Sequence, residues 1–226
     1  MIRVHVVCEG QSEEMFVNEM LLPIFQPKGI VLVPALLGKP GHKGGNVTIE
    51  RVVKDVRLRL LNDTTAYCTL LIDFYGISTK FPGYQQAIRM NQNVTKSKIM
   101  ISAMVQAIEI EVGSNAMRRF IPYIQMYEFE ALLFSDPSDF ASALGRPYLS
   151  DDLLKIRNKF RSPEEINDSP LTAPSKRIEE LYPEFEKPID GIFGAIEIGI
   201  KKIRTECPLF SDWLRHIEKL ADGAIK

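Results

Sequence analysis

The sequence has few of the residues and patterns that mark several common protein classes. Its three cysteines, Cys8, Cys68 and Cys207, are far apart and form no C-x-x-C pair, which argues against a disulfide framework and against a zinc ribbon. No apolar run approaches the roughly 20 residues that a membrane-spanning helix needs. The N-terminus leads directly into an alternating segment and does not resemble a signal peptide. We therefore expect a cytoplasmic protein with no membrane partner.

An excess of charge of one sign is also missing. Lys and Arg number 28 against 29 Asp and Glu, so no overall positive field attracts nucleic acid, and any such contact must use a local patch. The motifs of serine hydrolases, zinc proteases, P-loop proteins and dinucleotide-binding domains do not occur. With 226 residues, 45% of them hydrophobic, the chain is long enough for one large globular domain, or for one domain with an appendage.

The first 145 residues alternate between short apolar runs and amphipathic stretches. The apolar, β-branched runs predict strands at Ile2–Cys8, Ile30–Leu37, Ala66–Ile72 and Phe120–Met126. Helical spacing of apolar residues predicts helices at Glu13–Phe25, Thr48–Leu61 and Lys96–Val112, and another that opens within Glu128–Phe134. This alternation favours βαβ units. The predicted fold class is therefore α/β, with a parallel sheet of about four strands flanked by helices.

Beyond residue 145 the periodicity indicates helices alone. They are expected at Asp151–Phe160, Ser175–Leu181, Ile192–Thr205 and Ser211–Leu220. Prolines separate the first of these segments from one another. We therefore expect an α/β domain over residues 1–145 and an all-helical C-terminal subdomain over residues 146–226 that packs on it.

Four carboxylates follow the predicted strands. Glu9 comes after the first strand, Asp73 after the third, and Glu128 and Glu130 after the fourth. Ligands of an open parallel sheet bind beyond the carboxyl ends of its strands, so these acids are expected to converge and to hold Mg²⁺ or Mn²⁺. Each acid also has a simpler interpretation, since Glu9 suits a turn and Asp73 a helix cap. If a helix begins at Glu128, only one of the last two acids faces the site, and Glu128 is the better placed.

Two basic regions are candidates for binding phosphate. Residues 38–46 hold Lys43, Gly44 and Gly45, and the backbone N–H groups of such a loop can cradle an anion, although a mobile surface loop is the slightly favoured interpretation. Lys176 and Arg177 stand at a predicted helix start, where cations oppose the helix dipole. That conflict indicates that they serve an anion, which makes Lys176 a catalytic candidate and Arg177 a phosphate-binding candidate.

Several segments together resemble one bacterial family, the domain-of-unknown-function family 4276, which is similar to Toprim-like proteins. The segments are VVCEGQSEEMFV (6–17), LLIDFYG (70–76), FPG (81–83), FIPYIQMYEFEALLFSDP (120–137) and APSKRI (173–178). The resemblance implies a Toprim-like fold, Mg²⁺ binding and phosphoryl transfer on nucleic acid. It assigns Glu9 to the Toprim glutamate and Asp73 to the first aspartate of the Toprim Asp-x-Asp, while Tyr75 stands where the second aspartate is expected.

The resemblance also implies an ATPase partner, because relatives are often encoded beside an ATPase in defence-like gene pairs. Two functions therefore stand as hypotheses. The first is a Mg²⁺-dependent phosphodiesterase, a nuclease, with Glu9, Asp73, Glu128 and Lys176 as catalytic residues. The second is a non-catalytic Toprim-like subunit that binds or regulates an ATPase, in which the protein's own lysines and arginines neutralise the acids.

Overall fold

The computed structural model describes residues 1–38, 46–167 and 169–223, and the chain divides into two compact units. Unit 1 comprises Met1–Ile124 and Trp213–Lys226, and unit 2 comprises Gln125–Asp212. These bounds differ from the predicted division after residue 145. The segment that follows residue 124 packs on the later helices of unit 2, whereas the chain end from Trp213 onward packs on the sheet of unit 1.

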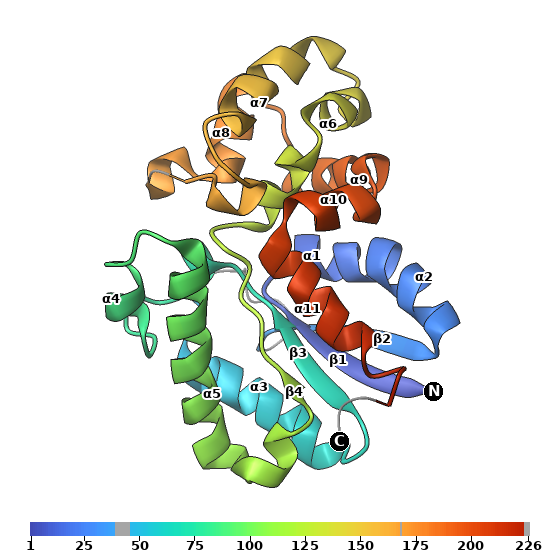
Figure 1. Ribbon diagram of the computed structural model, residues 1–226, viewed down its shortest axis with the longest axis vertical. Coiled ribbons are helices and arrows are strands. Elements are labelled where there is room, and N and C mark those ends of the chain that lie inside the picture. Colours follow the sequence, from blue (N-terminus) through green and yellow to red (C-terminus); the bar gives the residue numbers. More distant parts are fainter. Residues whose placement is uncertain (39–45, 168, 224–226) are drawn as a thin grey trace. The chain divides into compact units, whose positions relative to one another are not determined.

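Unit 1 is built on a four-stranded sheet in which every neighbouring pair is parallel (Figure 1). The strands are β1 (Ile2–Cys8), β2 (Ile30–Leu36), β3 (Tyr67–Leu71) and β4 (Phe120–Ile121), in the order β2-β1-β3-β4. The predicted parallel sheet of about four strands flanked by helices is thus confirmed. The first three strands match their predicted ranges closely, because β2 and β3 are nearly continuous apolar runs and β1 is interrupted only by Arg3 and His5.

The fourth strand is much shorter than its predicted range, Phe120–Met126. Its two residues pair with Cys68 and Thr69 of β3, and Pro122 follows directly. Proline has no N–H group to donate to a sheet ladder, which explains why the pairing ends there.

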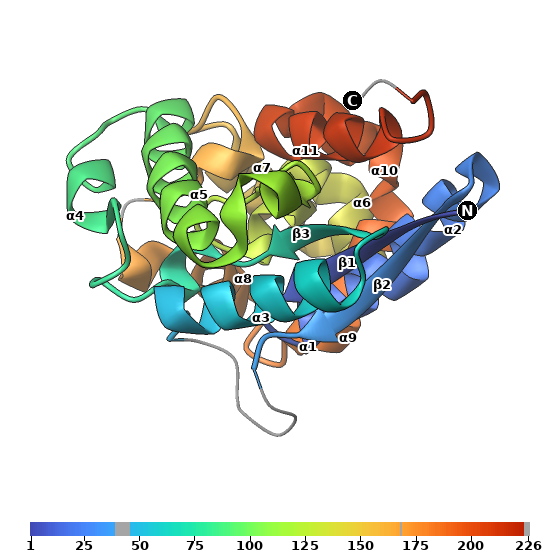
Figure 2. The same ribbon diagram turned by 90° about the horizontal axis from the view of Figure 1, so that it is seen from below.

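Helices connect the strands of unit 1. The connection from β1 to β2 contains α1 (Gln11–Phe16), a π-helical turn (Val17–Leu21) and α2 (Leu22–Phe25). Between β2 and β3 lies α3 (Ile49–Asn62), and between β3 and β4 lie α4 (Tyr84–Ala87) and α5 (Asn93–Met117). Gly113, with φ of 78°, interrupts α5 one residue after the predicted end of that helix. Figure 2 shows α3 on one face of the sheet.

The other face of the sheet carries the last part of α11 (Pro208–Glu218), from Trp213 onward (Figure 2). The Trp213 indole Nε1–H donates a hydrogen bond to Thr69 Oγ1 at 2.8 Å, and its ring stacks on Tyr123 with centroids 4.6 Å apart. A buried tryptophan needs a partner for its N–H group, so this bond fixes the helix at one place along β3.

The regular secondary structure of unit 2 is almost entirely helical over the residues that the structure describes. Its remaining α-helices are α6 (Pro137–Ala143), α7 (Ser150–Arg157), α8 (Pro174–Leu181), α9 (Lys187–Ile198) and α10 (Ile200–Glu206). The segment expected to open a helix within Glu128–Phe134 forms a 3₁₀-helix, Phe129–Ser135. The single helix predicted for Ile192–Thr205 is two helices, because Gly199 takes a left-handed φ of 78° between them. Among the described residues, no helix combines the length and apolar character required to cross a membrane.

Candidate functional site at the carboxyl edge of the sheet

Glu9 and Asp73 lie together at the carboxyl edge of the sheet. Glu9 directly follows β1, and its own N–H group donates to Leu71 O, the last residue of β3, at 3.0 Å. Its side chain reaches across to the next strand, where Glu9 Oε2 accepts a hydrogen bond of 2.9 Å from the main-chain N–H of Asp73. Both residues are half-buried. Because β1 and β3 are adjacent and parallel, two acids that are distant in sequence come within one hydrogen bond of each other.

These two acids occupy the switch point of the topology. From β1 the chain proceeds to β2 on one side of β1, and it later enters β3 on the other side. The loops after β1 and β3 therefore leave the sheet in opposite directions, and at such a point of a parallel sheet a crevice is expected between them. In parallel sheets this is the preferred position for a ligand.

Gly76 makes the approach of the Glu9 carboxylate possible. Gly76 ends the 3₁₀-helix Phe74–Gly76 that follows Asp73, and a Cβ atom placed on it would overlap both carboxylate oxygens of Glu9. Only glycine leaves this space open. The sequence signal for this role was the glycine three residues after Asp73, within the segment LLIDFYG.

The glycine-rich segment predicted to bind phosphate begins and ends at this same edge. On one side the Leu37 N–H donates to Cys8 O at 2.8 Å, and on the other the Val47 N–H donates to Gly76 O at 2.8 Å. Arg51 of α3 joins the two sides, since its guanidinium donates to Leu37 O at 3.1 Å and to Asn46 O at 3.0 Å. Three predicted phosphate-binding residues, Lys43, Gly44 and Gly45, lie outside the described residues.

The other two predicted carboxylates lie in unit 2, where they share one lysine. The Lys187 Nζ atom is 3.7 Å from Glu128 Oε1 and 3.4 Å from Glu130 Oε1. Glu128 is extended and the 3₁₀-helix starts after it, so both acids face the same cation. Glu130 is only 2% exposed, and Glu128 Oε2 accepts the N–H of Ser175 at 2.9 Å. Lys187 follows a stretch rich in acidic residues. Nothing in the sequence around Lys187 indicated that it contacts Glu128 and Glu130.

The two predicted cationic residues of α8 are engaged within unit 2. The Lys176 Nζ atom forms an exposed ion pair with Glu179 one turn later, at 2.5 Å. The Arg177 Nε–H donates to Thr172 O at 2.7 Å, and its guanidinium lies 5.5 Å from the centre of the Phe160 ring. Phosphate binding by Lys176 or Arg177 therefore stays a prediction. A bound phosphate would either share these side chains with their present partners or displace those partners.

The described residues contain no group of three or more His, Cys, Asp and Glu side chains arranged to hold one metal ion. Within each unit the acids instead form pairs, Glu9 with Asp73 and Glu128 with Glu130. The predicted metal set of all four residues therefore stays a prediction.

A family model for a domain of unknown function (DUF4276) matches residues 8–218. The chain belongs to this family. The match includes Glu9, Asp73, Glu128, Glu130 and Lys187, and thus both acid pairs and the lysine that the second pair shares. Searches among curated proteins and among solved structures found no match for this DUF4276 chain.

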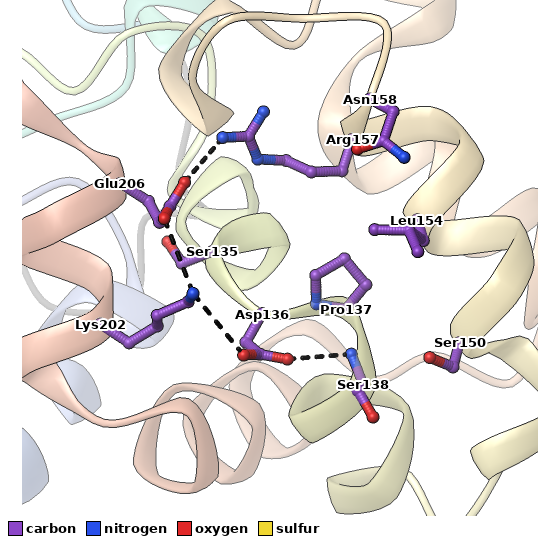
Figure 3. A pocket seen from close by; sticks show the side chains of 10 residues that line it. All are labelled: Ser135, Asp136, Pro137, Ser138, Ser150, Leu154, Arg157, Asn158, Lys202 and Glu206. Carbon is purple, nitrogen blue, oxygen red and sulfur yellow. Dashed lines mark hydrogen bonds and ion pairs between the residues drawn. The ribbon is translucent and has the colours of Figure 1, made fainter.

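A polar cavity of about 320 Å³ in unit 2 was not foreseen from the sequence (Figure 3). Four charged side chains line it and form a chain of ion pairs. Arg157 Nη2 is 2.7 Å from Glu206 Oε2, and Lys202 Nζ lies 3.6 Å from Glu206 Oε1 and 4.0 Å from Asp136 Oδ2. The charges cancel within the cavity, and Asp136 also caps α6 by accepting the N–H of Ser138 at 3.1 Å. The ion pairs of these residues link α7, α10 and the start of α6.

Proposed function

We propose that the protein is a Mg²⁺- or Mn²⁺-dependent phosphodiesterase of Toprim-like fold, a nuclease in which Glu9 and Asp73 hold the cation. The observation that carries this proposal is the hydrogen bond between the Asp73 N–H and Glu9 Oε2 at the switch point of the sheet. Acidic residues gathered at one edge of a sheet favour a site at which a positive charge offsets their repulsion. A divalent cation supplies that charge.

The donor chemistry of this edge fits such an ion. Mg²⁺ prefers oxygen ligands and keeps several of its waters, so one or two carboxylates together with substrate phosphate are sufficient. The space left open by Gly76 allows the Glu9 carboxylate to remain at the edge. A bound cation would polarise the phosphate and lower the pKa of an attacking water.

The residues of the chain itself would orient and neutralise the substrate. The Asp73 N–H holds Glu9 Oε2 in place, which limits the motion of a group that could also accept the proton of an attacking water. Arg177, Lys176 and the predicted loop cation Lys43 are the candidates for offsetting charge on the phosphoryl oxygens. Tyr75 in place of a second aspartate means that any third protein ligand must come from elsewhere, and Glu128 and Glu130 remain the predicted source.

The second candidate function is a non-catalytic binding or regulatory subunit, with an ATPase as the predicted partner. It is favoured by Lys187, whose ammonium already lies within 4 Å of both Glu128 and Glu130. In this alternative the acids are structural and the protein takes up no divalent cation. The same fold would then serve as a docking module.

Titration calorimetry with Mn²⁺ and with Mg²⁺, together with cleavage of labelled DNA and RNA, distinguishes the two functions. The informative variants are Glu9→Gln and Asp73→Asn. Both leave the hydrogen bond intact, because the Gln amide oxygen can accept it and the Asp73 donor is main chain. Glu109→Gln, an exposed acid on α5, is the matched control.

The phosphodiesterase requires metal binding and metal-dependent cleavage by the wild type and by Glu109→Gln. Both signals should be lost in Glu9→Gln and Asp73→Asn, with the melting temperature of each nearly unchanged. A wild type that binds neither ion supports the binding module instead. Full cleavage by Asp73→Asn would remove Asp73 from the mechanism.

A further inference from the structure

The polar cavity of unit 2, drawn in Figure 3, is walled by two helices whose lining residues recur at helical spacing. Ser150, Leu154 and Arg157 lie on one face of α7, four and three residues apart. Lys202 and Glu206 lie on one face of α10, also four residues apart. The space of about 320 Å³ is within the range of small-molecule sites, so the cavity is large enough for a ligand.

The charged groups of the cavity do not all bond to one another. Glu206 Oε2 accepts a hydrogen bond from Arg157 Nη2 at 2.7 Å. Lys202 Nζ, in contrast, lies 3.6 Å from Glu206 Oε1 and 4.0 Å from Asp136 Oδ2, which exceeds the length of a hydrogen bond. Over the residues that the structure describes, the Lys202 ammonium and these two carboxylate oxygens take part in no hydrogen bond. One cationic donor group and two anionic acceptors are thus available to a ligand.

The order of the charges determines which class of ligand the cavity can hold. Along the chain of ion pairs the sign alternates, from Arg157 to Glu206 to Lys202 to Asp136. A simple anion beside Lys202 would meet a carboxylate on either side, and a simple cation between the carboxylates would meet the lysine. A zwitterion satisfies both signs at once, because its negative group bonds to the lysine while its positive group bonds to the carboxylates. Free α-amino acids carry both charges on groups attached to one carbon atom.

The wall formed by α7 suits a short polar side chain. Figure 3 shows Ser150, Leu154 and Asn158 on the side of the cavity opposite Lys202. Among the described residues, the Ser150 hydroxyl and the Asn158 side-chain amide form no hydrogen bond, so both are available to a ligand. Leu154 is 43% exposed and adds one apolar surface beside them. The side chains of serine, threonine and asparagine match this wall in size and polarity.

We propose that this cavity is a binding site for a free α-amino acid with a short polar side chain. The ligand carboxylate bonds to the Lys202 ammonium, and the ligand ammonium bonds to Glu206 Oε1 and Asp136 Oδ2 in place of the long Lys202 contacts. The ligand side chain faces Ser150 and Asn158. All of these residues belong to unit 2 and none is a candidate metal ligand, so the proposal is independent of the phosphodiesterase.

Titration calorimetry of the full chain with L-serine, L-threonine and L-asparagine tests the proposal. At least one of them should bind, with a dissociation constant on the order of micromolar to millimolar. Two analogues of the tightest binder isolate its charges, since the N-acetyl form lacks the ammonium and the amide form lacks the carboxylate. Each analogue should bind about tenfold more weakly than its parent, or worse, because one sign of the cavity is then left without a partner.

Two variants test the walls of the cavity. Lys202→Gln removes the partner of the ligand carboxylate and should weaken binding about tenfold or more. Lys201→Gln is its matched control, because Lys201 is the preceding exposed lysine of α10 and does not line the cavity. Leu154→Phe places a larger side chain in the opposite wall and should also weaken binding. Its control is Leu171→Phe, since Leu171 is 86% exposed and lies outside the cavity. Thermal melts establish that all four variants are folded.

The proposal is overturned if none of the three amino acids binds at millimolar concentration, or if either analogue binds as tightly as its parent. It is equally overturned if Lys202→Gln and Lys201→Gln bind the amino acid alike, or if Leu154→Phe binds it as the wild type does.

Discussion

The main-chain N–H of Asp73 donates a 2.9 Å hydrogen bond to Glu9 Oε2, across the ends of two adjacent parallel strands. This bond fixes the carboxylate of one candidate metal ligand against the backbone of the other. A mononuclear site needs its ligands held in this way before the ion arrives, because unrestrained side chains lose conformational entropy on binding.

Gly76→Ala should destabilise unit 1 by about 0.5–1.5 kcal/mol, since the new methyl group overlaps the Glu9 carboxylate, whose side chain must move away and give up its hydrogen bond from the Asp73 N–H. Urea unfolding measures the change. Adding Glu9→Ala to the same chain removes the overlapping group and should recover part of the loss. Gly191→Ala in α9 is the control, because its Cβ would meet Phe129 at an ordinary 3.5 Å, and a helix interior tolerates alanine well. Equal costs at the two glycines would contradict the role of Gly76.

Lys187→Gln should lower the free energy of unfolding by about 1–2 kcal/mol. The lysine is the cation shared by Glu128 and Glu130, and Glu130 is almost completely buried. Removing the cation that faces a buried acid costs more than removing one member of an exposed pair, and because the Lys187 side chain is 40% exposed, solvent screening keeps the cost below that of a fully buried pair. Lys155→Gln, which breaks the exposed pair with Asp152, should change stability by less than about 0.5 kcal/mol. Similar small effects from both variants would show that Lys187 does not neutralise this acid pair.

Glu164 makes stability depend on pH. It is 1% exposed, and burial raises the pKa of its carboxyl from 4.5 to about 7, although the N–H groups of Leu209 and Phe210 donate to it at 3.0 and 2.8 Å. Between about pH 4.5 and pH 7 the folded state therefore holds a proton on Glu164 that the unfolded chain has released. The stability contributed by this proton is fully present below about pH 4.5 and is lost as the pH rises through about 7.

The loss should amount to roughly 1–3 kcal/mol between pH 5 and pH 8. Urea unfolding at a series of pH values measures it for the wild type and for Glu164→Gln. The glutamine cannot ionise, so the difference between the two curves should change across this range. Curves that run parallel would mean that Glu164 titrates near its ordinary pKa.

Thr69→Val should cost about 1–3 kcal/mol, because valine keeps the shape of threonine but removes two buried hydrogen bonds. Thr69 Oγ1 accepts the Trp213 indole N–H at 2.8 Å and donates to Ile121 O at 2.6 Å. Trp213→Phe retains stacking with Tyr123 and removes the other end of the first bond. In a double-mutant cycle the combined variant should lose less stability than the sum of the two single variants. Strict additivity would indicate that the Thr69–Trp213 bond contributes nothing.

The local sequence pattern was sufficient to predict the strands of the sheet, but not the residues at which several elements end. The strands β1, β2 and β3 were predictable because a buried parallel strand is a continuous apolar run with clear boundaries. The early end of β4 at Pro122 and the break at Gly199 depend on backbone hydrogen bonding and dihedral angles, which apolar periodicity does not report. The boundary between the two units also differs from the predicted boundary after residue 145. It depends on which distant segments pack together, and local sequence pattern does not report this.

The sequence by itself determined that Glu9 and Asp73 follow strands, because a strand's end can be read from where its apolar run stops. The order of the strands, which makes β1 and β3 neighbours and brings these acids within one hydrogen bond, was decided only in the tertiary structure. The same holds for Lys187 between Glu128 and Glu130, and for Gly76 beneath the Glu9 carboxylate. Local propensity acts over a few neighbouring residues, whereas a site is made of contacts between residues far apart in the chain, and packing of the whole chain selects those contacts.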